Sequence, residues 1–173
     1  KAGLAPVAPL MKRIASLETK SDLIALFGEL QGVISTPVTL GAGVDPKDPS
    51  RYLAVARQGG LGLPDRDYYL KEDARFAKAG AAYRDYLETL FQLSGDAQAR
   101  HSADDVFALE KRIAEAHWNK VENRDPVNTY NPTPLAALAD RAPSLAWTSF
   151  LKTAGFPDVT TINVTQPSEV DTV

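Results

Sequence analysis

Residues 59–70, Gly-Gly-Leu-Gly-Leu-Pro-Asp-Arg-Asp-Tyr-Tyr-Leu, restrict what this chain can fold into more than any other stretch. Its three glycines allow backbone angles that a Cβ forbids. Pro64 fixes its own φ and holds Leu63 in an extended conformation. The leucines and the tyrosine pair around these residues are too dense for a flexible linker. The stretch therefore predicts a shaped, partly buried loop that joins a strand-like segment to a long helix.

A glycine-rich loop also raises the alternative of a phosphate-binding site. Such a site needs a buried strand before the glycines and a helix whose N-terminus opens directly at them. Here Pro64, Asp65 and Asp67 come between the glycines and the helix, and their carboxylates repel a phosphate. We therefore interpret the stretch as a structural loop whose tyrosines fill a gap between helices.

The composition of the chain excludes several classes of protein. At 173 residues it is long enough for one domain with a substantial core. Its net charge of −3, with both signs interspersed, indicates no nucleic-acid partner and no membrane contact. Cysteine is absent, which excludes disulfides and thiolate chemistry. Because the chain starts at Lys1 and stops after a helix-start signal at residues 167–169, we expect a piece of a longer polypeptide.

Apolar residues at helical spacing predict a mainly α fold. The expected helices are residues 5–17, 21–34, 73–93, 102–116, a short one after Thr133, and 143–155. Ser21, Ser102 and Thr133 are the expected N-caps, because a hydroxyl accepts a hydrogen bond from a free backbone N–H. Gly95 is expected to end the third of these helices in a left-handed conformation, and Pro143 to start the last.

A small β-hairpin is expected beside the helices. Apolar and polar residues alternate over residues 36–44 and 51–58, and residues 45–50 form a turn cluster with two prolines. Such a hairpin is marginal alone, so it must pack against the helices or gain further strands. Residues 161–165 are predicted to be another β segment. Asp45 and Asp48 suggest a cation site, but the spacing of a Ca²⁺ loop is missing, so we interpret them as turn-capping residues.

Several further motifs occur in order along the chain: residues 45–52, 57–58, 60–70, 109–114, 123–125 and 130–132, and Pro143, Trp147 and Leu151. Together they resemble the N-terminal lobe of the neprilysin and endothelin-converting-enzyme family of zinc metallopeptidases. The resemblance runs from about residue 10 to residue 170. Animal members of that family carry disulfides, so the lack of cysteine favours a bacterial member.

The resemblance implies a zinc endopeptidase of two lobes that cleaves small peptides inside a chamber. Residues 1–173 would then be one domain, part of the helical lobe, and the catalytic zinc lobe would lie outside this chain. The helical lobe would form a wall of the chamber and limit access to it. The implied partners are the catalytic lobe of the same polypeptide and small peptides. An extracytoplasmic location, periplasmic or secreted, is implied as well.

No catalytic residue and no metal ligand is predicted in this chain. A zinc peptidase of this type needs H-E-x-x-H on one helix face, whereas the only histidines are His101 and His117. We expect His101 to be exposed just before an N-cap, and His117, beside Trp118, to be a partly buried packing or hydrogen-bonding residue rather than a ligand. No G-x-S-x-G elbow is present. Residues 127–130 look like the family's substrate-binding segment, but they follow a helical-lobe motif, so we assign no substrate contact to this chain. Zinc is implied only for the full-length protein.

One alternative belongs to another class of protein. The same helical pattern is compatible with a free-standing helical protein-interaction module that has no enzymatic activity. The flanking sequence separates the two, because only the peptidase requires H-E-x-x-H and a Glu-x-x-x-Asp further along the same gene.

Overall fold

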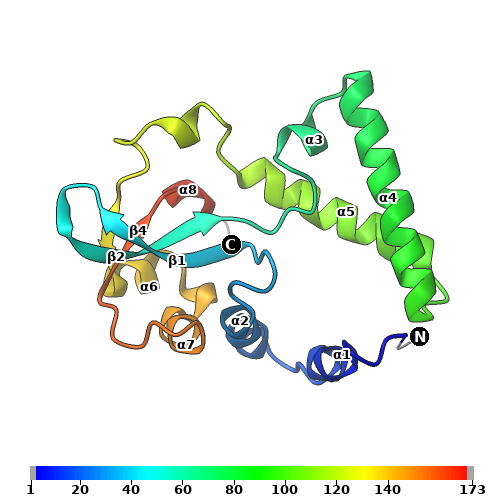
Figure 1. Cartoon of the computed structure of the whole chain (residues 1–173), viewed down its shortest axis with the longest axis horizontal. Coiled ribbons are helices and arrows are strands. Elements are labelled where there is room, and N and C mark those ends of the chain that lie inside the picture. Colours follow the sequence, from blue (N-terminus) through cyan, green and yellow to red (C-terminus); the bar gives the residue numbers. More distant parts are fainter. Residues whose placement is uncertain (1–2, 171–173) are drawn as a thin grey trace.

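The computed structural model of the chain describes residues 3–170. A small sheet with short helices around it occupies one end of an elongated molecule, and two long helices extend at the other end (Figure 1). These are α4, Ala74–Ser94, and α5, Ala99–Ala116. The mainly α fold with a small β element is confirmed. Within residues 3–170, the structure holds no helix with the length and apolar character that a membrane span requires.

The two N-terminal helices form where the sequence predicts them, but they begin and end at other residues. They are α1, Ala8–Ala15, and α2, Lys20–Glu29. The prediction that Ser21 caps the second helix is wrong, because Thr19 takes that role. The Thr19 hydroxyl accepts a hydrogen bond from the Asp22 N–H, and the Asp22 carboxylate accepts one from the Thr19 N–H, which makes a reciprocal capping box. The helix also ends at Glu29 rather than near residue 34.

The long helices confirm one predicted boundary and correct another. Gly95 ends α4 with a left-handed φ of 86°, as predicted. The next helix, α5, begins at Ala99 rather than at Ser102. The Ser102 hydroxyl does not cap it, because it donates to Oδ2 of Asp96 at 2.6 Å, in the turn between the two helices.

The predicted hairpin is confirmed and belongs to a four-stranded sheet. Strands β1, Val38–Asp45, and β2, Asp48–Gln58, are antiparallel neighbours. The predicted segment near residue 161 forms β4, Thr161–Val164, which pairs in parallel with β2. A short strand β3, Pro132–Pro134, completes the order β1-β2-β4-β3. The hairpin therefore gains its additional strands from later parts of this same chain.

The C-terminal helices are more broken than predicted. Thr133 lies in β3, where its hydroxyl donates to the Asn131 carbonyl at 2.9 Å, so it does not cap α6, Leu135–Arg141. The helix predicted over residues 143–155 is split. A 3₁₀ turn, η2, Pro143–Leu145, is followed by Ala146 with a left-handed φ of 40°, and then by α7, Trp147–Thr153.

The hydrophobic core lies between the sheet and the helices α2, α6 and α7. Trp147 and Phe150 of α7 are 2% and 1% exposed, and they pack with Leu138 of α6 and with Ile162 and Val164 of β4. Neither α4 nor α5 contributes a residue to this cluster. The two long helices must therefore be joined to the core by other contacts, which the loop before α4 provides.

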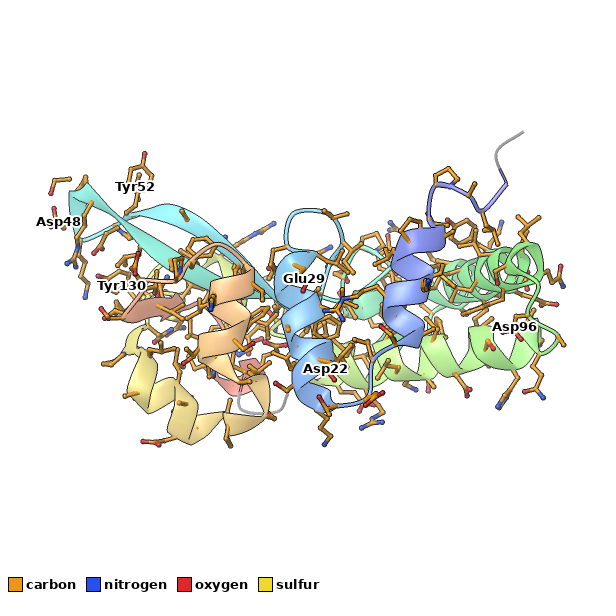
Figure 2. All side chains as sticks on the ribbon, turned by 90° about the horizontal axis from the view of Figure 1, so that it is seen from below. Asp22, Glu29, Asp48, Tyr52, Asp96 and Tyr130 are labelled. Carbon is orange, nitrogen blue, oxygen red and sulfur yellow. The ribbon has the colours of Figure 1, made fainter. Side chains whose placement is uncertain are left out.

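Asp45 fixes the tip of the hairpin. The residue is fully buried, and its carboxylate accepts hydrogen bonds from the Lys47 N–H, the Arg51 side chain and the Tyr130 hydroxyl. Burial opposes ionisation, but these hydrogen bonds outweigh it and hold the pKa of Asp45 below its usual value. Tyr130 and Asp48 lie together at this end of the molecule in Figure 2. The carboxylate of Asp45 is thus hydrogen-bonded by Arg51 and Tyr130, in agreement with a capping role in the turn.

Candidate functional site

A polar cleft of about 510 Å³ separates the loop before α4 from the segment after α5. Residues 59–67 form one wall, and residues 117–124 form the other. Arg66, Lys120 and Arg124 line it together with Asp65 and Asp67. The stretch that most restricts the fold thus also shapes a cleft with charged walls.

Two glycines let the loop leave the sheet in close contact with the segment before β1. The Gly59 N–H donates to the Pro37 carbonyl at 2.8 Å, and the Gly60 N–H donates to the Ser35 hydroxyl at 2.9 Å. Gly60 has a left-handed φ of 82°, and a Cβ there would lie 2.9 Å from the Pro37 Cα. Both the backbone angle and the lack of space therefore require glycine at residue 60.

The tyrosines fill the gap between the long helices, as predicted. The loop ends in a short helix, α3, Asp67–Leu70. The Tyr69 hydroxyl donates to one oxygen of Glu110 at 2.8 Å and accepts from the Leu63 N–H at 2.9 Å. The Tyr83 hydroxyl of α4 donates to the other Glu110 oxygen at 3.0 Å. Burial, reinforced by the Glu110 carboxylate, raises the pKa of both tyrosines, so both hydroxyls stay protonated donors.

Replacing Tyr69 by phenylalanine is expected to destabilise the chain by about 1–2 kcal/mol, because the Leu63 N–H and the Glu110 carboxylate each lose a hydrogen bond. The measurement is urea denaturation followed by circular dichroism. Tyr86→Phe is the matched control, since that side chain is 56% exposed, and it should unfold like the wild type. Equal midpoints for the two variants would contradict this assignment.

His117 closes the floor of the cleft. The residue is 6% exposed, and its Nε2 lies 3.0 Å from the Gly59 carbonyl oxygen, which only accepts, so Nε2 carries the proton. Burial, together with the charge of Arg66, lowers the pKa of His117, and the ring is neutral at pH 7. Of the two predicted roles, packing or hydrogen bonding, the structure shows the hydrogen bond, and the residue is more deeply buried than predicted. Next to it, the Gln58 side chain makes two hydrogen bonds with the Trp118 backbone.

An ion pair connects the two walls of the cleft. Nζ of Lys120 lies 2.7 Å from Oδ2 of Asp65, whose side chain is only 16% exposed. Burial opposes ionisation of Asp65, but Lys120 and the Asp67 N–H outweigh it and lower the pKa of this carboxyl. Both charges are therefore present at neutral pH, and the pair holds the loop against the segment after α5.

The described donors do not fit a zinc site. His101 lies inside α5, not before its N-cap as predicted, and its side chain is 72% exposed, as expected, with Nε2 3.4 Å from Asp105. His117 follows the end of α5, sixteen residues after His101, which at the helical rise places it on the order of 24 Å away. Across residues 3–170, no group of three His, Cys, Asp or Glu side chains is placed to hold a metal ion. The residues from 3 to 170 thus offer no set of zinc ligands.

Two residues of the C-terminal segment were missed by sequence reasoning. Gln166 joins the sheet to the cleft, because its Oε1 accepts from the Gln58 N–H at 3.0 Å and its Nε2 donates to Asn123 at 2.6 Å. Glu169 is buried, at 1% exposure. Only a helix-start pattern marks this region in the sequence, and that pattern carries no sign of contacts more than a hundred residues away in the chain.

Solved structures of longer proteins contain this fold. The crystal structure of Mycobacterium tuberculosis zinc metalloprotease Zmp1 with an inhibitor is similar to this chain, with a TM-score of 0.91 and 32% identity. The likeness covers 99% of this chain but 27% of that protein. The structure of PepO from Lactobacillus rhamnosis shares the fold, with a TM-score of 0.80 at 19% identity. The chain thus has the fold of one part of the Zmp1 metalloprotease, and PepO shares that fold.

The sequence comparisons identify the family. The sequence model of peptidase family M13 matches residues 1–173. Endothelin-converting enzyme-like 1 of Rattus norvegicus is 33% identical over 130 residues, which are 73% of this chain and 17% of that protein. Human endothelin-converting enzyme 1 is 31% identical over 126 residues, 71% of this chain and 16% of that protein. The chain belongs to peptidase family M13, the neprilysin and endothelin-converting-enzyme family, and it spans about a sixth of the length of these curated relatives.

Proposed function

We propose that this chain is part of a zinc-dependent endopeptidase of small peptides, and that it walls the substrate chamber without supplying catalytic residues. The observation that carries the proposal is the match of the whole chain to family M13, combined with its coverage of only 27% of a zinc metalloprotease of that family. The zinc ligands and the catalytic lobe then belong to the remainder of the full-length polypeptide. An extracytoplasmic location is part of the same proposal.

The contacts around the cleft support the role of a wall. The loop of residues 59–70 is fixed to the core by Gly59 and Gly60, and to the long helices by Tyr69. The Lys120–Asp65 pair adds a further connection. A wall that limits the size of substrates has to resist opening, and these contacts cross between the two ends of the molecule.

The full-length polypeptide is expected to bind one zinc ion and to cleave short peptides, whereas this chain alone is expected to do neither. Zinc content by mass spectrometry and cleavage of a fluorogenic peptide measure the two properties. In the full-length polypeptide, Gly60→Ala should keep the zinc and the cleavage of short peptides. It should also increase the cleavage of longer substrates several-fold, because the loop in the wall is loosened.

Gly95→Ala provides the matched control. Gly95 has a similar left-handed φ of 86°, but no atom of residues 3–170 lies within 4 Å of a Cβ there. The residue is in the turn between α4 and α5, away from the cleft. Its size selectivity should equal that of the wild type. Stoichiometric zinc or peptide turnover by this chain alone would contradict the proposal. A full-length polypeptide without zinc or cleavage would favour the helical interaction module instead.

A further inference from the structure

An apolar groove of about 700 Å³ runs between α2 and α5. Leu23 and Phe27 of α2 line one side, and Leu109 and Ile113 of α5 line the other. Leu23 is 38% exposed and Leu109 is 53% exposed, although both belong to the apolar faces of their helices. Apolar residues gathered in a groove, rather than scattered singly, indicate a surface that another segment covers.

Glu169 lines this groove, and no donor within residues 3–170 bonds its carboxylate. The residue is 1% exposed, and neither of its carboxylate oxygens has a partner among the described residues. The charged groups beside it are Arg112 and Glu115, which line the groove without bonding to those oxygens. Buried polar groups in folded proteins nearly always have a partner, since an unpaired one is strongly disfavoured. The apolar side chains of the groove are therefore uncovered, and the Glu169 carboxylate needs a hydrogen-bond donor that residues 3–170 do not supply.

Glu169 is held in place by its neighbours. It belongs to the short helix α8, Pro167–Val170. The Trp118 indole N–H donates to the Ser168 hydroxyl at 2.7 Å, and Gln166 is bonded to Gln58 and Asn123. Figure 1 shows α8 in the middle of the molecule, between the sheet and α5. Hydrogen bonds therefore hold Gln166 and Ser168, which come just before Glu169, and with them the start of α8.

We propose that the groove between α2 and α5 is the docking site for a segment of the same polypeptide that follows Val173. That segment packs apolar side chains against Leu23 and Leu109 and places one hydrogen-bond donor on the Glu169 carboxylate. This inference rests on the proposed function, because it requires the full-length M13 polypeptide.

The length and direction of the chain favour a segment of the same polypeptide over a second copy. The Zmp1 chain is nearly four times as long as the part that this chain matches, since the match covers 27% of it. Val170, at the end of α8, directly follows the buried carboxylate, so the described part of the chain ends beside the groove. A segment tethered at that point has a high effective concentration at the site and a small loop-closure entropy.

The test places the photo-crosslinking amino acid p-benzoylphenylalanine at Leu109 of the full-length polypeptide. Irradiation is expected to give an intramolecular product, and peptide mapping should find the partner downstream of residue 173. Leu93 is the control position, because it is 71% exposed on α4 outside the groove and should not give this product. Adding Glu169→Leu should lower the yield about fivefold or more, because the donor on the segment loses its acceptor.

Each outcome decides the matter. A crosslinked dimer would identify a second copy as the occupant, and the absence of any crosslink would mean an open groove; both would overturn the inference. A yield unchanged by Glu169→Leu would remove the carboxylate from the docking site. Zinc content and peptide cleavage are measured on the same samples, so a failure of this inference is distinguishable from a failure of the proposed function.

Discussion

Replacing Gly28 by leucine is expected to destabilise the chain by about 3 kcal/mol, near the upper end of the range for overpacked cores. Gly28 is the point where α2 meets α7. A Cβ there would overlap the Thr153 hydroxyl and would lie 2.6 Å from the Phe150 backbone oxygen. A backbone oxygen inside a helix cannot turn aside as a side chain can, so the two helices must separate. The separation opens the core around Trp147 and Phe150.

Urea denaturation measures the effect, and Gly80 supplies the control. Gly80 is also a buried helical glycine, but a Cβ there would first meet the Phe107 ring at 3.3 Å, which is the end of a side chain. Gly80→Ala is therefore expected to stay within about 1 kcal/mol of the wild type, helped by the better helix propensity of alanine. Gly28→Ala should fall between Gly80→Ala and Gly28→Leu. A wild-type midpoint for Gly28→Leu would contradict the close packing of α2 on α7.

The parts of the fold that the sequence predicts well are those that local chemistry decides. The alternating residues of the hairpin indicate its two strands, and the boundaries of α4 follow from its own ends. Asp73 accepts hydrogen bonds from the N–H groups of Arg75 and Phe76, and Gly95 takes the left-handed conformation. Each of these features depends on residues within one turn of the chain. Burial of His117 was also expected from its place beside Trp118, although its partner, the Gly59 carbonyl, was not.

The helix starts that were predicted wrongly have competing candidates. Thr19 and Ser21 both carry a hydroxyl, and the choice depends on Asp22, whose carboxylate completes a capping box only with Thr19. Near Ser102, the carboxylate of Asp96 engages the hydroxyl and leaves α5 to begin earlier. The preference for Ser, Thr or Asp at helix starts therefore predicts the region where a helix begins. The hydrogen-bond partner of each side chain decides which residue is the N-cap.

The parts that could not be predicted depend on residues far apart in the chain. The parallel pairing of β2 with β4 joins Ala54 to Ile162, and no local pattern specifies such a register. The left-handed Ala146 divides a helical pattern that has no breaker at that residue. The same limit applies to the candidate site. Gln166 and Glu169 acquire their surroundings only when the C-terminal segment returns to the sheet and to α5.

Glu169→Gln is expected to stabilise this chain increasingly as the pH rises, by about 3 kcal/mol more at pH 8 than at pH 4. Burial raises the pKa of Glu169 to about 7, from a usual value of 4.5. Between these two values the unfolded chain loses the proton first, so the contribution of Glu169 to the stability of the wild type falls as the pH rises and levels off above about pH 7. A rise in pKa from 4.5 to about 7, at about 1.4 kcal/mol per pH unit, gives this difference of about 3 kcal/mol in the free energy of unfolding. Glutamine carries no charge, so the variant lacks this loss.

Urea denaturation of both proteins from pH 4 to pH 8 measures the slope, and Glu115→Gln on the exposed rim of the groove should keep the slope of the wild type. The sign is expected to reverse in the full-length polypeptide. There a donor on the docked segment bonds the carboxylate, and Glu169→Gln weakens that bond instead of relieving an unpaired charge. The same pH dependence in the wild type and in Glu169→Gln would mean that the carboxylate already has a partner, and would remove the reason for a donor on the docked segment.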